Sequence, residues 1–149
     1  MADAAVPPGQ LVLDLGAGEG ALTAHLVAAG ARVVAVELHP ARAARLRDRF
    51  AGAPVTVVHA DALAVPLPSR PFRVVANPPY AIASPLLRLL LARGSRLVRA
   101  DLVLQRALVR RFAEDPPRHW QVYPGRPLPR RAFRPAPRVD SAVLVVRRP

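Results

Sequence analysis

The sequence predicts an α/β domain built on a mostly parallel, seven-stranded sheet with helices on both faces. Short apolar runs alternate with helical stretches from residue 11 onward, and this alternation is typical of a parallel sheet. A glycine-rich turn follows the first apolar run, as in open α/β sheets that bind ligands where their strands end. The chain has 149 residues, 52% of them hydrophobic, so it can bury a sizeable core as one domain.

Seven segments are expected to be strands, because they are short, apolar and bounded by glycine, proline or polar residues. They are residues 11–15, 32–37, 55–58, 73–76, 97–104, 120–123 and 141–146. The sixth segment is the expected antiparallel partner of the seventh. Prolines recur from residue 116 onward, which excludes long helices from that part of the chain.

Four helices are expected between these strands. They cover residues 21–29, 40–50, 81–93 and 105–114. Gly30 and Gly52 follow the first two helices, and Pro40 suits the first turn of the second. The sequence has no internal repeat, and the proline-rich stretch after residue 116 does not indicate a second domain, so residues 1–149 are expected to form one domain.

Composition excludes several classes of protein. No apolar run reaches the ~18 residues that a membrane helix needs, and the first residues lack the order of a signal peptide. The chain has no cysteine, so it has neither a disulfide framework nor a thiolate metal site. Its four histidines lack metal-ligand spacing. A cytoplasmic protein without a metal or a membrane segment is therefore expected.

Basic charge is concentrated in the second part of the chain. The formal net charge is +12, and all 22 basic residues are arginine. Residues 1–92 hold eight arginines and six acidic residues, whereas residues 93–149 hold 14 arginines and four acidic residues. A positive field on one part of a small domain favours a polyanionic partner. Coding bias combined with solubility is the alternative explanation.

Three acidic residues follow or end successive strands and predict a nucleoside cofactor. Gly16 and Gly18 lie between the first strand and the first helix, where glycine lets the backbone approach a ligand. Glu37 ends the second strand and can accept hydrogen bonds from two ribose hydroxyls. Asp14 beside the turn suits a cationic ligand such as S-adenosylmethionine better than a pyrophosphate. Asp61, after the third strand, can accept from an adenine amino group.

The segment Asn77-Pro78-Pro79-Tyr80 follows the fourth strand and predicts a site for a planar amine. The Asn77 side-chain carbonyl and the Pro78 backbone carbonyl can each accept one N–H from the amine. Proline fixes φ, so the direction of that backbone carbonyl is set before the substrate binds. Tyr80 can stack on a flat base. A proline turn that merely ends a strand is the alternative interpretation.

A third segment, Phe133 to Ser141, precedes the last expected strand. Phe133 on this proline-stiffened loop can supply a second face for a base extruded from its stack, or it can plug the space under the last strand. Five arginines lie in or near the segment and can follow RNA phosphates, or form a solvated loop. They are Arg126, Arg130, Arg131, Arg134 and Arg138.

These motifs together resemble the ribosomal RNA adenine N6-methyltransferases, which comprise the Erm macrolide-resistance enzymes and the KsgA-type dimethyltransferases. The resemblance runs from Leu11 to Arg147. It rests on DLGAGEGALT at 14–23, AVELHP at 35–40, HADAL at 59–63, ANPPYAIASPLL at 76–87, LQRALVRR at 104–111 and FRPAPRVDSAV at 133–143. The last motif is highly specific to this family, and Pro78 with the arginine-rich composition resembles actinobacterial Erm proteins.

The resemblance implies a Rossmann-like class I methyltransferase sheet with an antiparallel last strand. It implies S-adenosylmethionine bound by the cofactor segments, and an unpaired adenine of large-subunit ribosomal RNA held by Asn77, Pro78 and Tyr80, with Phe133 as the second aromatic. The implied cofactor residues are Asp14, Gly16, Gly18, Glu37, Leu38, Asp61, Ala62 and Asn77. A monomeric RNA methyltransferase that confers macrolide-type resistance is the resulting expectation.

Three departures separate this chain from the family pattern. The Gln-Asn-Phe segment before the first strand and the C-terminal helical RNA-binding domain of relatives are missing, and Ala107 stands where relatives usually have Glu. The expectation is therefore a catalytic domain only. One alternative is a domain that binds cofactor or RNA with little turnover. Another is a DNA adenine N6-methyltransferase, in which Asn-Pro-Pro-Tyr also occurs, although residues 133–143 argue against it.

Overall fold

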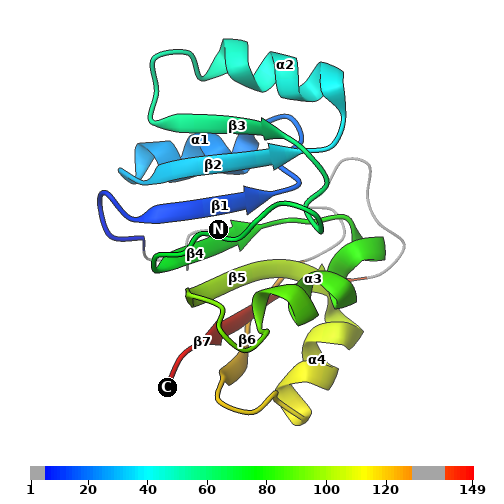
Figure 1. Cartoon of the computed structure of the whole chain (residues 1–149). Coiled ribbons are helices and arrows are strands. Elements are labelled where there is room, and N and C mark those ends of the chain that lie inside the picture. The colour runs from blue at the N-terminus through cyan, green and yellow to red at the C-terminus, as the bar shows by residue number, and fades with distance from the viewer. Residues whose placement is uncertain (1–5, 129–139) are drawn as a thin grey trace.

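The computed structural model describes residues 6–128 and 140–149, and their strands form one sheet (Figure 1). These strands are β1 (Leu11–Leu15), β2 (Arg32–Glu37), β3 (Val55–His59), β4 (Phe72–Ala76), β5 (Leu97–Gln105), β6 (Gln121–Leu128) and β7 (Ser141–Arg147). The order across the sheet is β3-β2-β1-β4-β5-β7-β6. Strands β1 to β5 pair in parallel, whereas β7 is antiparallel to both of its neighbours, β5 and β6. The predicted mixed sheet is confirmed.

The helices fall close to their expected places. They are α1 (Ala21–Ala28), α2 (Pro40–Arg49), α3 (Ala83–Leu90) and α4 (Arg106–Glu114), with a short 3₁₀ helix η1 (Tyr80–Ile82) before α3. The helix expected over 81–93 is wrong at both ends, because η1 forms its first turn and α3 ends at Leu90. A turn follows, in which Ser95 N–H donates to the Ala92 carbonyl at 3.1 Å. Of the described helices, none is long and apolar enough to cross a membrane.

Successive residues of each strand point to opposite faces of the sheet, and each face has its own core. On one face, Val12 packs with Leu26 of α1 and Leu46 of α2. On the other, Leu13 belongs to a larger cluster that includes Leu86 of α3. Figure 1 shows the same division, with α3 and α4 on the side of the sheet opposite α1. Helices on both faces were predicted, and this is confirmed.

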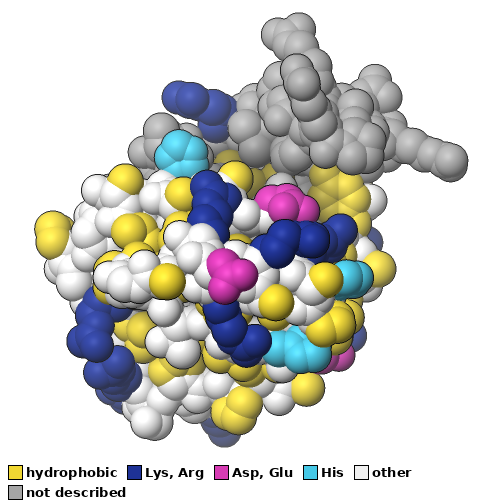
Figure 2. All heavy atoms as spheres, turned by 90° about the horizontal axis from the view of Figure 1, so that it is seen from above, with side chains coloured by type: hydrophobic (Ala, Val, Ile, Leu, Met, Phe, Trp, Pro, Cys, Tyr) yellow, Lys and Arg dark blue, Asp and Glu magenta, His cyan; other side chains and the backbone are white. Residues whose placement is uncertain are grey.

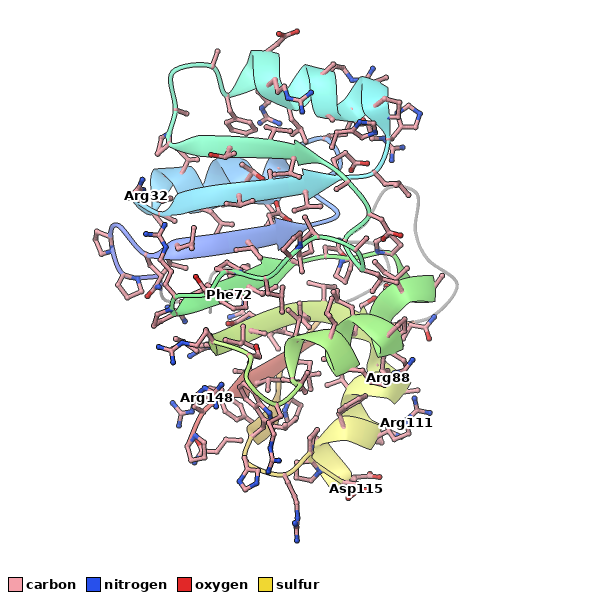
Figure 3. The ribbon with its side chains drawn as sticks, in the orientation of Figure 1. Arg32, Phe72, Arg88, Arg111, Asp115 and Arg148 are labelled. Atoms are coloured by element: carbon pink, nitrogen blue, oxygen red, sulfur yellow. The ribbon has the colours of Figure 1, made fainter. Side chains whose placement is uncertain are left out.

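The strand order reverses direction between β1 and β4, which are neighbours although β2 and β3 separate them in sequence. Ligands of open α/β sheets bind beside the carboxyl ends of strands at such a point. All five residues of β4 are buried, and Phe72 at its start is fully enclosed (Figure 3). The turn after β4 is therefore carried by a rigid central strand.

Candidate active site

The turns that follow β1, β2, β3 and β4 converge on one cavity of about 710 Å³. This volume lies within the range of sites that bind small ligands. Residues from all four turns line it, including Gly16, Gly18, Glu37, Leu38, Asp61, Ala62, Asn77, Pro78 and Tyr80. The structure thus brings together most of the residues that the sequence predicted for a cofactor and a target amine.

The turn after β1 is shaped by backbone contacts. Gly16 has φ +81°, a left-handed conformation that glycine adopts without strain. Its N–H donates to the Val36 carbonyl at 2.8 Å, and the N–H of Ala17 donates to the same carbonyl at 3.0 Å. These bonds fix the turn against the end of β2. The space beside Gly16 is filled by the prolines of the turn after β4.

The Glu37 carboxylate is held by two backbone groups. Gly18 N–H donates to Oε1 at 2.8 Å, and His39 N–H donates to Oε2 at 2.8 Å. The residue is 5% exposed yet lines the cavity. A carboxylate has about four acceptor sites, so two oriented oxygens retain the capacity to accept from a pair of ribose hydroxyls. This geometry supports the predicted contact with a nucleoside.

The turns after β2 and β3 add an apolar side chain and a second acid. Leu38 is 65% exposed, an unusual state for a large apolar residue, and it lines the cavity. Its carbonyl contacts His59 Nε2 at 2.9 Å, which ties this turn to the end of β3. Asp61 is exposed and accepts from the Leu63 N–H at 2.9 Å, whereas Ala62 is buried. An adenine ring can lie between the apolar surface and the carboxylate.

Asp14 lies behind this surface. Its carboxyl is 1% exposed and accepts a hydrogen bond from the Thr23 hydroxyl at 2.7 Å. Burial raises its pKa from 3.8 to about 7, the Thr23 hydrogen bond lowers the pKa, and nearby Glu37 raises it. The described residues that form the cavity wall do not include Asp14. Its predicted contact with the cofactor remains a prediction.

The residues of the turn after β4 differ in their exposure to solvent. Asn77 is exposed and Pro78 is buried, while Tyr80 is half-buried at the start of η1. All three line the cavity. The Tyr80 hydroxyl forms a hydrogen bond with the Ser141 hydroxyl at the start of β7. Phe133 lies outside the described residues, so the predicted second aromatic remains a prediction.

Two features of the site were missed in the sequence. Arg42, in the first turn of α2, lines the cavity, but arginines are too frequent in this chain for one to be distinctive. The link between Tyr80 and Ser141 joins residues 61 positions apart. One indication of this hydrogen bond was present in the sequence, because Ser141 is the last residue of the segment predicted to carry the second aromatic residue.

Exposed arginines lie on several sides of the described surface, and Figure 3 labels Arg32 and Arg148 on the side of the sheet away from Arg88 and Arg111. Figure 2 shows arginines together with acidic side chains on the face that carries α2. There Glu19 lies 4.0 Å from Arg42 and from Arg45. Figure 3 shows Arg88 and Arg111 extending outward from α3 and α4. Both are exposed, on the side of the molecule where the parallel strands end. Positive charge there suits a polyanion near the cavity.

The sequence of the chain is similar to those of several known proteins. Residues 1–123 match the family model described as ribosomal RNA adenine dimethylase. The chain is 39% identical over 145 residues to the mycinamicin-resistance protein MyrB of Micromonospora griseorubida, covering 92% of this chain and 46% of that protein. It is 39% identical over 164 residues to ribosomal RNA small subunit methyltransferase A of Leifsonia xyli subsp. xyli, covering 95% and 57%.

A solved structure is also similar over most of the chain. The 23S rRNA methyltransferase ErmE superposes with a TM-score of 0.89 at 33% identity, covering 98% of this chain and 64% of that one. The chain spans about half the length of the curated relatives it matches.

Proposed function

Because the chain belongs to the ribosomal RNA adenine dimethylase family, we propose that it transfers methyl groups from S-adenosylmethionine to an adenine N6 of ribosomal RNA. One observation carries this proposal. The turn with Asn77, Pro78 and Tyr80 lines the same cavity as Glu37 and Leu38. Groups suited to a planar amine and groups suited to a nucleoside cofactor therefore share one space.

The cavity wall fits the cofactor in its donor and acceptor chemistry. Glu37 is set to accept from the ribose hydroxyls, because the Gly18 and His39 amides orient both of its oxygens. Leu38 offers an apolar face for the adenine, and Asp61 an acceptor for its amino group. When bound, S-adenosylmethionine supplies a methyl group on a sulfonium, which is already a strong leaving group.

The chain's own contribution to methyl transfer is to align the amine. The Asn77 side-chain carbonyl and the Pro78 backbone carbonyl accept the two N–H bonds of the adenine amino group, and Tyr80 stacks on the base. Such contacts would orient the amino nitrogen toward the methyl group that the cofactor supplies. A general base is not required before attack, because the nitrogen loses its proton only after it becomes cationic.

We propose large-subunit ribosomal RNA as the substrate, with an unpaired adenine as the target. MyrB is a resistance protein and ErmE is a 23S rRNA methyltransferase, which supports this choice. The relative from Leifsonia xyli is a small-subunit methyltransferase at the same identity as MyrB. Small-subunit RNA is therefore the comparison that any test must include. Bases in paired RNA helices are poorly accessible, which favours an unpaired adenine.

The proposal is tested by incubating the protein with methyl-labelled S-adenosylmethionine and protein-free ribosomal RNA. Large-subunit RNA, small-subunit RNA and an adenine-containing DNA are compared, and the modified nucleoside is identified by mass spectrometry. We expect N6-methylated adenosine in large-subunit RNA. Asn77→Ala is expected to lower the rate at least about a hundredfold, since orientation of the amine is lost.

Each other outcome has a definite meaning. Equal rates for the parent and Asn77→Ala contradict the role of Asn77. Label mainly in small-subunit RNA contradicts the large-subunit assignment, and label in DNA supports the DNA methyltransferase alternative. Calorimetric binding of the cofactor without transfer to any substrate supports a binding domain that does not turn over.

A further inference from the structure

The hydroxyl of Tyr80, which lines the cavity, forms a hydrogen bond with the hydroxyl of Ser141. Ser141 is fully buried, whereas Tyr80 is half-buried and lines the cavity. The tyrosine ring therefore lines the cavity, while its hydroxyl is bonded to a serine hydroxyl that water does not reach. Buried hydroxyls are stable only when hydrogen-bonded, so this bond is the favoured state of both groups.

Ser141 is itself held in a fixed place. It is the first residue of β7 and pairs with Gln105 of β5 and Leu128 of β6. Next to it, the Asp140 carbonyl accepts from the Arg106 N–H at 2.9 Å, which joins the start of β7 to the start of α4. On the other side, Ala142 belongs to the hydrophobic core. Ser141 therefore lies at the edge of the sheet where β5 ends, with a paired strand on each side of it.

The other end of Tyr80 is fixed by the proline turn. Pro79 precedes η1 with φ −55° and ψ 137°, and its carbonyl accepts from the Ile82 N–H at 3.1 Å. A tyrosine side chain has only two rotatable χ angles. With the backbone fixed at one end and the hydroxyl at the other, the ring has little freedom to tilt.

We propose that Ser141 is a positioning residue, which holds the ring of Tyr80 at the angle that receives the target adenine. This inference rests on the proposed function and assigns a role to a residue outside the Asn77–Tyr80 turn. It also connects the amine site with the start of β7. A competing explanation is that the bond only ties β7 to the turn after β4 and leaves base binding unaffected.

The chain has two tyrosines, which allows a direct test. Tyr123 on β6 contacts Arg147 and is not a cavity residue, so Tyr123→Phe leaves Tyr80 as the single tyrosine. In that background, ¹³C-labelled tyrosine gives one ring signal by NMR. The protein is saturated with S-adenosylhomocysteine and titrated with adenosine monophosphate, with Ser141→Ala compared with Ser141. Ser69→Ala, in the exposed loop before β4, is the matched control.

We expect adenosine monophosphate to shift the Tyr80 signal. We expect Ser141→Ala to move the free signal and to weaken the nucleotide's affinity roughly fivefold, because the ring loses the hydrogen bond that fixes its angle. Ser69→Ala should change neither. An unchanged Tyr80 signal in Ser141→Ala overturns the proposal, as does a moved signal with unchanged affinity, which is the result for a purely structural tie. Absence of any nucleotide-induced shift overturns it too.

Kinetics on ribosomal RNA separate this inference from the proposed function. Ser141→Ala and Tyr80→Phe should each lower kcat by a similar factor and leave the KM for the cofactor unchanged. The double variant should be no slower than either single variant, because each single variant already removes the same hydrogen bond. If the parent transfers no methyl groups, the proposed function fails, while the NMR titration still decides whether Ser141 orients Tyr80. Additive losses in the double variant overturn the inference.

Discussion

Gly16 and Pro79 line the candidate active site and lie so close together that a Cβ atom on Gly16 would crowd the proline ring. A Cβ atom placed on Gly16 would lie 3.2 Å from the Cδ of Pro79 and 3.7 Å from the Cα of Pro78. The first distance is tighter than ordinary van der Waals contact. The glycine turn after β1 and the proline turn after β4 therefore pack so closely that a side chain on Gly16 would push the proline turn by a few tenths of an ångström.

Gly16→Ala is accordingly expected to disturb both halves of the site. The φ of +81° costs an alanine about 1–2 kcal/mol, and its methyl group pushes the proline turn outward. Since misplacement by a fraction of an ångström impairs alignment of the amine, we expect methyl transfer to fall about ten- to a hundredfold. Gly52→Ala is the matched control, because Gly52 has φ +80° with nothing within 4 Å. Gly52→Ala should show in thermal unfolding only the loss of stability that the positive φ causes, and it should keep its activity. Equal activity of the two variants would contradict the steric argument.

Glu37→Gln tests whether the oriented carboxylate binds the cofactor. A glutamine can accept from only one of the Gly18 and His39 amides, and its own amide group faces the other N–H as a second donor. We expect calorimetric affinity for S-adenosylmethionine to fall at least about tenfold, with a loss of about 1–3 kcal/mol in unfolding free energy. Glu19→Gln is the control, since Glu19 is an exposed carboxylate with distant partners at 4.0 Å. Equal affinity in both variants would exclude Glu37 from the cofactor site.

The positions of these residues illustrate what the sequence can predict. The strand bounds of β1 and β2 match the expected ranges, because short apolar runs bounded by glycine leave few alternatives. Glu37 is predictable for the same reason, as it ends a strand whose neighbour carries the glycine turn. The carboxyl ends of parallel strands lie at the same edge of the sheet. Residues that follow different strands can therefore be predicted to lie close together, although they are far apart in sequence.

Contacts between distant side chains were not predictable in this way. The bond between Tyr80 and Ser141 depends on β7 lying between β5 and β6. The pairing of β7 with β6 was expected, but no local pattern places β7 beside β5. The burial of Asp14 was also missed, because a carboxylate before a glycine turn suits an exposed ligand contact equally well. Its true surroundings depend on where α1 places the Thr23 hydroxyl.

Leu38→Ser tests the apolar part of the cofactor site. Leu38 is 65% exposed, so its replacement removes little buried area and should leave the thermal unfolding midpoint nearly unchanged. If its side chain packs on the adenine of the cofactor, affinity should fall roughly tenfold, the effect of exposing one such contact. Val98→Ser, another exposed apolar position at 41% on β5, should bind the cofactor like the parent. Unchanged affinity in Leu38→Ser would remove Leu38 from the site.

Asp14 predicts a characteristic dependence of stability on pH. Its pKa is about 7 in the folded protein and near 3.8 without the fold. Between these values the folded protein keeps a proton that the unfolded chain releases, so the free energy of unfolding falls as pH rises through this window. The slope is at most about 1.4 kcal/mol per pH unit. Asp14→Asn, which cannot ionise, should gain stability relative to the parent from pH 4 to 7 and stay level above it.

Urea unfolding at half-unit steps from pH 4 to 8 measures this difference. Asp48→Asn, an exposed position on α2, shows the general effect of removing one carboxylate, and its difference from the parent is subtracted. The same series with saturating S-adenosylmethionine tests the cofactor contact predicted for Asp14. A cation beside the carboxyl favours its charged form, so the upper limit of the window should move to lower pH and binding near pH 6 should release a proton. An unmoved window would place Asp14 beneath the cofactor site, as a structural support of the glycine turn alone.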